Sequence, residues 1–196
     1  MKFIKTPFLA MLLIAGLLPG ATAEAKEASG TMLAIQCSGC HGFEGVTTGP
    51  GIPSIAGMTE EYLVLSMKDY KADNRKGTLM NRIAKGYSDT EITAMAGYFA
   101  GLKYAGHQQS PDASLVAKGK DLQQRHCESC HEESGAKADG IGILAGQNMT
   151  YLHYAIADFM SGDRPMERRK KQKMDQLITD EGEAGFNAII HYYSSR

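Results

Sequence analysis

The sequence predicts an all-α protein built from two similar helical domains in tandem. Three observations carry this prediction. The motif Cys-x-x-Cys-His occurs twice, at residues 37–41 and 127–131, and together the two copies use all four cysteines of the 196-residue chain. Apolar residues recur at helical spacing around both motifs. The residues that follow the two motifs also match one another at a constant offset, which indicates an internal repeat.

The composition fits a globular chain of ordinary charge. Hydrophobic residues make up 43% of the sequence, and 21 Lys and Arg nearly balance 22 Asp and Glu. The formal net charge of -1 excludes a strongly basic nucleic-acid binder and an acidic disordered chain as descriptions of the whole protein.

The N-terminus has the pattern of an export signal. Two lysines precede an apolar run over residues 8–18, which a Pro-Gly pair ends. An Ala-Thr-Ala tripeptide at 21–23 then supplies a small-residue cleavage site. The run is shorter than the ~20 residues of a membrane-spanning helix. We therefore expect a signal peptide over residues 1–23 and a periplasmic protein with no membrane span after cleavage; an uncleaved anchor is the alternative.

The first domain is expected over residues 24–104. Met32 lies on a short helical run before the first motif, and a loop rich in Gly and Pro follows the motif. A middle helix then contains Tyr62. Residues 88–91, Ser-Asp-Thr-Glu, form a capping box that opens the last helix. Its apolar residues follow the spacing i, i+3, i+4, i+7 and are Ile92, Met95, Ala96 and Phe99.

The second domain is expected over residues 114–196, after a polar linker at 105–113. Several pairs share an offset of 89 with the first domain, namely Tyr62 with Tyr151, Tyr70 with Phe159 and Arg75 with Arg164. The final apolar pattern, Phe186, Ile189, Ile190 and Tyr193, follows its counterpart at an offset of 94. The second domain therefore carries a five-residue insertion between Arg164 and its last helix.

The Cys-x-x-Cys-His motif is the attachment signature of c-type haem. Its two thiols add to the two vinyl groups of one porphyrin, and the histidine binds the iron. Disulfides or a zinc site are the alternatives, but neither explains a histidine after the second cysteine of both motifs. We expect two covalently bound haem c groups. Their predicted protein ligands are Cys37, Cys40 and His41 for the first haem, and Cys127, Cys130 and His131 for the second.

A six-coordinate electron-transfer haem needs a second axial ligand, and a methionine thioether stabilises the reduced iron. Met80 lies in the expected loop between the middle and last helices of the first domain, whereas Met67 fits a core position and Met58 lies too close to the attachment motif. In the second domain Met166 and Met174 both remain candidates. The internal register favours Met174, which follows Met80 at an offset of 94.

The other polar features are interpreted more simply. The histidines outside the motifs are expected to be ordinary polar residues; they are His107, His126, His153 and His191. A basic run over residues 164–173 forms either a solvated surface or a docking surface for an acidic redox partner.

Two longer stretches carry a family resemblance. Met-Asn-Arg-Ile-Ala-Lys-Gly-Tyr-Ser from Met80 and Arg-Pro-Met-Glu from Arg164 resemble the di-haem class I cytochromes c, and more specifically the cytochrome subunits of flavocytochrome c sulfide dehydrogenases. The resemblance implies two class I cytochrome c domains with one covalent haem each. It also implies Met166 as the second sixth ligand, because Arg-Pro-Met-Glu belongs to the family pattern. The family often has a further methionine where this chain has Lys170.

The resemblance implies an electron carrier in sulfide oxidation. In that family an FAD-containing flavoprotein oxidises sulfide, and the di-haem chain, bound to it as a heterodimer, takes the electrons and passes them to a soluble acceptor such as another cytochrome. This chain has no dinucleotide-binding glycine motif and no spare cysteine, so we expect no catalytic residue and no enzyme activity of its own. A free di-haem shuttle to a terminal oxidase is the alternative, and a haem peroxidase is a third possibility.

The two domains are expected to face different partners. Residues 45–52 and 78–80 of the first domain are mostly small or apolar, which suits a lasting interface with the flavoprotein. The basic run of the second domain suits brief, salt-sensitive encounters with an outside acceptor.

Overall fold

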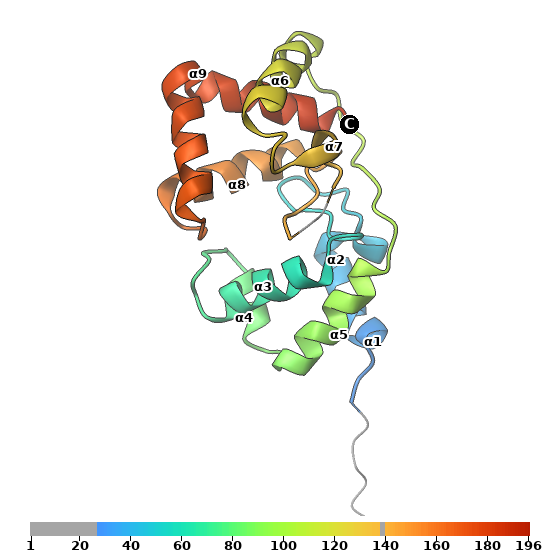
Figure 1. The fold of residues 1–196 in the computed structure, drawn as a ribbon. Coiled ribbons are helices and arrows are strands. Elements are labelled where there is room, and N and C mark those ends of the chain that lie inside the picture. The colour runs from blue at the N-terminus through green and yellow to red at the C-terminus, as the bar shows by residue number, and fades with distance from the viewer. Residues whose placement is uncertain (1–26, 138–139) are drawn as a thin grey trace, which may run out of the picture.

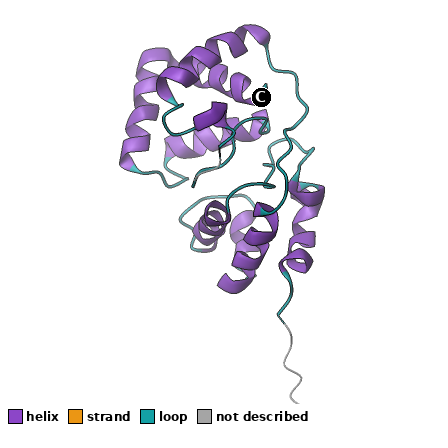
Figure 2. Cartoon of the chain, turned by 45° about the vertical axis from the view of Figure 1, so that its right-hand side comes forward, coloured by secondary structure: helices purple, strands orange, loops and turns teal. Residues whose placement is uncertain are grey.

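The computed structural model describes residues 27–137 and 140–196 (Figure 1). The expected signal peptide at 1–23 lies outside the described residues. Within the described part of the chain, every regular element is a helix (Figure 2), so the all-α prediction is confirmed. No helix among the described residues combines the length and the apolar character needed to cross a membrane.

The helices fall into two consecutive sets, which lie in two halves of the molecule (Figure 1). The first set is α1 (Gly30–Ala34), η1 (Ile35–Cys37), α2 (Ser38–His41), η2 (Phe43–Gly45), α3 (Glu60–Lys71), α4 (Met80–Ala84) and α5 (Asp89–Ala100). The second set is α6 (Ala113–His126), α7 (Glu132–Gly135), α8 (Met149–Ser161) and α9 (Arg168–Ser194). The domain limits given above stay a prediction.

Side-chain caps fix where the main helices begin. The predicted capping box is confirmed: Glu91 N donates to Ser88 Oγ at 3.2 Å, and Ser88 N donates to Glu91 Oε2 at 2.7 Å. The side chains of Thr59 and Asn148 accept hydrogen bonds from the first turns of α3 and α8. These caps satisfy backbone donors that have no partner inside the helix.

The first and last helices of each half cross at a glycine. A Cβ atom added to Gly30 of α1 would lie 2.2 Å from Ala94 O of α5. A Cβ atom added to Gly119 of α6 would lie 2.0 Å from Ala188 O of α9. Both distances are far below van der Waals contact, so only glycine permits these crossings.

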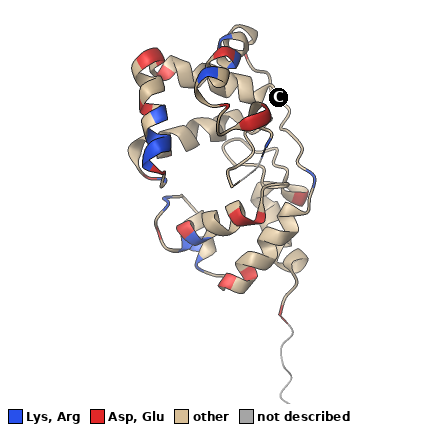
Figure 3. Ribbon diagram, in the orientation of Figure 1, with Lys and Arg blue, Asp and Glu red and all other residues tan. Residues whose placement is uncertain are grey.

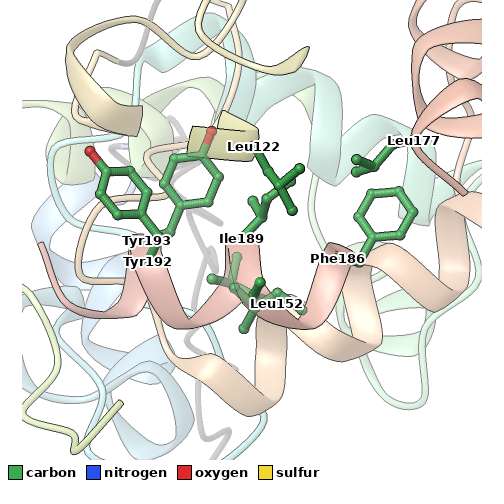
Figure 4. Close-up of a cluster of buried hydrophobic side chains, with 9 residues drawn as sticks. Leu122, Leu152, Leu177, Phe186, Ile189, Tyr192 and Tyr193 are labelled. Atoms are coloured by element: carbon green, nitrogen blue, oxygen red, sulfur yellow. The ribbon is translucent and has the colours of Figure 1, made fainter. Parts of the chain in front are cut away.

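The apolar face predicted for each last helix is buried. Ile92, Met95, Ala96 and Phe99 of α5 are at most 4% exposed. In the second half the face of α9 packs with α6 and α8 in one cluster, drawn in Figure 4 with Leu122, Leu152, Leu177, Phe186, Ile189, Tyr192 and Tyr193 labelled. The periodicity therefore identified the core side of both helices correctly.

The insertion predicted in the second half lengthens α9. In the first half a short α4 ends before α5 begins, with Ser88 as the N-cap between them. In the second half α9 consists of two helical segments that meet at a kink at Gly182, whose φ of 65° and ψ of -167° are not helical. Gly182 stands at the position of Ser88, so the stretch of α9 before Gly182 replaces α4 with a longer helix.

A loop of the first half packs against the start of α8 in the second. Ser54 N donates to Gln147 Oε1 at 2.9 Å, and Gln147 Nε2 donates to Ser54 O at 3.0 Å. Gly51 N donates to Asn148 Oδ1 at 3.2 Å. Ser54 and Gln147 are fully buried. Asn148 Nδ2 also donates to Gly49 O at 3.3 Å, so part of the 45–52 segment lies in this contact, whereas Thr48 and Pro50 are exposed. The expectation that the segment forms part of a surface for an outside partner stays a prediction.

The glycine crossings give a testable prediction. Gly119→Ala should destabilise the protein by about 1–3 kcal/mol, because the new methyl group forces α6 away from α9. Chemical denaturation of the haem-loaded protein measures this loss. Gly101→Ala is the matched control, because its Cβ would lie 3.5 Å from the nearest atom. Equal stability of the two variants would contradict the close crossing.

Candidate haem-binding sites

A cavity of about 1510 Å³ reaches across both halves of the molecule. It exceeds the range of roughly 300–1,000 Å³ typical of a pocket for one small ligand. Both Cys-x-x-Cys-His motifs line it, together with apolar side chains from α3, α5, α8 and α9. The motif residues on its wall are Cys37, Cys40, His41, Cys127, Cys130 and His131. An apolar cavity with two thiols and one imidazole at each end fits two covalently attached haems.

The first motif lies on η1 and α2 with its histidine already oriented. Cys37 is half-buried and Cys40 is exposed, and neither is in a disulfide. His41 Nδ1 donates to the carbonyl oxygen of Pro53 at 2.8 Å, which leaves Nε2 as the nitrogen free to bind iron. Burial lowers the pKa of His41, against the opposing effect of the Pro53 hydrogen bond. The imidazole is therefore neutral at pH 7, as an iron ligand must be.

The second motif has the same chemistry but a differently held histidine. Burial, with a further contribution from the charge of Lys170, lowers the pKa of His131 to about 4. Its Nδ1 atom is buried and has no hydrogen-bond partner among the described residues. Tyr193 contacts the ring edge to face at 6.2 Å between centroids. Aromatic packing, in place of a backbone carbonyl, orients the second imidazole.

Met80, the sixth ligand predicted for the first haem, lies on a short helix between α3 and α5, where the sequence analysis expects a loop. It is half-buried, opens α4 and lines the cavity. The competing methionines have other contacts: Met58 Sδ accepts a hydrogen bond from Ile143 N at 3.1 Å, and Met67 packs in a cluster with Ile92.

Met166 and Met174 both line the cavity in the second half. Met166 lies in the loop between α8 and α9, two residues after Arg164. The corresponding residue of the first half, two residues after Arg75, is Gly77. Met174 lies within α9, half-buried against the apolar cluster that α6, α8 and α9 form in the second half. It precedes the break at Gly182 by eight residues, as Met80 precedes Ser88.

Three of the remaining histidines do not line the cavity, whereas the fourth, His126, does. His107 Nδ1 donates to Thr47 O at 3.0 Å, and His191 Nδ1 accepts from Asp112 N at 2.9 Å. His153 does not line the cavity, whereas His126 reaches its wall.

One group of cavity residues was missed as a site by sequence reasoning. Arg75 and Arg164 lie on the cavity wall between the halves, with Tyr62 and Tyr151 beside them. The sequence analysis used these four residues as markers of the repeat, and it also counted Arg164 in the basic run and in the Arg-Pro-Met-Glu stretch, but it did not predict a shared site. Their shared offset of 89 was the signal that could have revealed a paired site.

Comparison with known proteins identifies the family. The family model described as cytochrome c matches residues 25–103. Cytochrome c4 of Pseudomonas aeruginosa is 33% identical over 164 residues, which cover 79% of this chain and 81% of that one. The cytochrome subunit of sulfide dehydrogenase of Chlorobaculum tepidum is 41% identical over 81 residues, covering 41% and 73%. A thiosulfate dehydrogenase electron acceptor of Thiomonas intermedia is 30% identical over 156 residues, covering 72% and 70%.

Comparison with solved structures also finds a cytochrome c4. The crystal structure of reduced cytochrome c4 from Pseudomonas stutzeri superposes with a TM-score of 0.71, at 24% identity over 86% of this chain and 99% of that one. Two tandem helical domains, two attachment motifs and a cavity that suits two covalent haems agree with these relatives. The chain therefore belongs to the cytochrome c family, as a di-haem electron carrier and not an enzyme in its own right.

Proposed function

We propose that the chain is an exported, periplasmic electron acceptor for a sulfide-oxidising dehydrogenase, bound as a heterodimer to an FAD-containing flavoprotein subunit. In this proposal the chain passes its electrons to a soluble acceptor such as another cytochrome. The observation that carries the di-haem part of this proposal is the one cavity that both attachment motifs line, and the sulfide-oxidising partner rests on the similarity to the sulfide dehydrogenase subunit. Each haem would supply a one-electron redox centre, and both would lie in this shared cavity.

The chain's own residues prepare each iron site for electron transfer. His41 and His131 are kept neutral by burial, as iron ligands must be. The apolar walls exclude water from the irons. We propose Met80 as the second ligand of the first haem. For the second haem the correspondence of α9 with α4 favours Met174, and Met166, which the family resemblance suggests, remains the alternative.

The surface around the first motif supports a lasting partner on that side. Met32, Ile35 and Phe43 are 65%, 67% and 81% exposed. They flank the cysteines of the first motif in the sequence, whereas the position of Phe43 in the second half is taken by Glu133. Exposed large apolar side chains near a redox centre favour a desolvated protein interface.

The surface beside the second haem site is basic. Figure 3 shows Lys and Arg gathered at the start of α9. Lys170 and Lys171 pair with Glu167 and Asp175, whereas Arg168 and Arg169 are exposed. Lys170 also lines the cavity, so this basic surface reaches the second site. Long-range attraction of an acidic acceptor is the function such a surface supports.

A free di-haem shuttle that carries electrons to a terminal oxidase is the second candidate. It is favoured by the similarity to cytochrome c4, which spans more of the chain than the similarity to the sulfide dehydrogenase subunit.

Native purification separates the two candidates. The sulfide dehydrogenase proposal predicts that FAD co-purifies with the two haems in about one-to-two ratio and that sulfide reduces the complex. Flavin is measured by fluorescence after acid release, and haem by absorbance. A flavin-free protein that sulfide reduces only after a separate dehydrogenase is added would support the shuttle instead.

Methionine variants test the iron ligands. Met80→Ala should remove about half of the weak far-red band that a methionine-bound ferric haem shows, because one of two thioether ligands is lost. Met174→Ala should remove the other half, and Met166→Ala should leave the band unchanged. Loss of the band in Met166→Ala, with Met174→Ala unaffected, would reverse the assignment for the second haem.

Charge reversal tests the basic surface. Arg168→Glu with Arg169→Glu should slow reduction of an acidic external acceptor about tenfold at low salt, because attraction becomes repulsion. The difference should shrink above 0.1 M salt, where charges beyond about 10 Å are screened. Stopped-flow absorbance measures the rate. Lys103→Glu with Lys120→Glu makes the same charge change on exposed residues elsewhere. An equal effect of the control pair would assign the slowing to net charge alone.

A further inference from the structure

The two motif histidines differ in the hydrogen bond of the ring nitrogen that faces away from the iron. His41 Nδ1 donates to the carbonyl oxygen of Pro53 at 2.8 Å. His131 Nδ1 is buried and meets no acceptor in the part of the chain that the structure describes. A metal-bound imidazole that donates through its second nitrogen is the more basic ligand and gives more electron density to the metal. The two sites therefore differ in an interaction that acts directly on an iron ligand.

The loops that follow the two histidines have the same backbone frame but different lengths. In the first half Ile55 N donates to Gly45 O at 2.8 Å, and in the second half Leu144 N donates to Gly135 O at 2.8 Å. The motifs themselves are offset by 90 residues, whereas Ile55 and Leu144 are offset by 89. The second loop is thus one residue shorter, so its backbone cannot reach its histidine in the same way.

The shortened loop is held by the first half of the chain. Gly142 stands at the position of Pro53, and a Cβ atom added to it would lie 3.0 Å from the hydroxyl oxygen of Tyr62. The next residue, Ile143, is 6% exposed and donates its N–H to Met58 Sδ at 3.1 Å. The backbone that would serve His131 therefore serves the contact between the halves.

The other neighbours of His131 do not take the place of this carbonyl. Tyr193 packs edge to face against the imidazole, and Gln123 donates to the backbone carbonyl of His131 at 3.4 Å. Burial and the charge of Lys170 lower the pKa of His131. The Lys170 ammonium also pairs with Glu167 at 2.7 Å, which balances its charge. The missing hydrogen bond is therefore the larger difference between the two histidines.

We propose that the second haem has the higher midpoint potential, because His131 lacks the backbone acceptor that His41 has. A less basic ligand stabilises ferric iron less and so favours the ferrous state. One electron then leaves the ferrous iron of the first site and reduces the ferric iron of the second, with no atom or proton transferred. The inference rests on the two haems with methionine as both sixth ligands, and it gives the direction of flow within the proposed function.

The test measures the midpoint potential of each haem in the isolated, haem-loaded chain by spectroelectrochemistry. We expect the electron to favour the second haem about tenfold, which corresponds to a difference of about 59 mV. Cys37→Ala marks the first haem in the spectrum, since one vinyl group then stays unreacted, and Cys127→Ala marks the second. The order of the two potentials should be the same with either mark. No partner protein is present, so the result is independent of which dehydrogenase or acceptor the chain serves.

A direct measurement of the hydrogen bond does not depend on any variant. In proton NMR spectra of the reduced protein, the Nδ1–H signal of His41 should lie downfield of that of His131, because hydrogen bonding to a carbonyl deshields the proton.

A variant of the first loop then links the bond to the potential. Pro53→Gly gives the backbone the freedom of Gly142, and it should raise the first potential toward the second and move the His41 signal upfield. Pro50→Gly is the matched control, because it makes the same change at an exposed position of the same loop that does not line the cavity. It should leave both potentials unchanged.

Three results would overturn the proposal. One is a first haem whose potential equals or exceeds that of the second. Another is an Nδ1–H signal of His131 as far downfield as that of His41, which would show that the loaded protein supplies an acceptor. The third is a Lys170→Gln variant in which the difference between the potentials disappears, which would assign that difference to charge.

Discussion

The fold depends on one apolar cavity that the two halves of the chain share. The first half buries two small clusters, and one of them takes in Ile143 from the second half. Domains of this size leave a large share of their apolar surface uncovered. Covalent attachment at Cys37 and Cys40, and again at Cys127 and Cys130, brings an apolar group into that cavity permanently. The helices, the glycine crossings and the loop contacts are arranged so that its walls stay in place.

The local part of this arrangement could be predicted from sequence. The capping box at Ser88, the apolar faces of α5 and α9, and the two attachment motifs each depend on residues within a few positions of one another. The spacing of residues along the sequence predicts such features, because a helical face or a cap is defined by neighbours three or four residues apart.

The contacts between the halves could not be predicted in the same way. Ser54 pairs with Gln147, and Arg164 with Tyr62, across about half the chain in each case. Periodicity carries no information on which distant residues meet, so the contacts of Gly49 and Gly51 with Asn148 were not predicted.

The two halves share residues at buried positions and differ at exposed positions around the haem sites. Gly30 and Gly119 stand at corresponding helix crossings in the two halves, and Arg75 and Arg164 also stand at corresponding positions. Close packing and buried charge tolerate few alternative residues at such positions. At the rim, solvent imposes no such limit, and Phe43 in one half corresponds to Glu133 in the other. Two haem sites with similar interiors but unlike surfaces are what the proposed function would require, since in that proposal electrons enter from one kind of partner and leave to another.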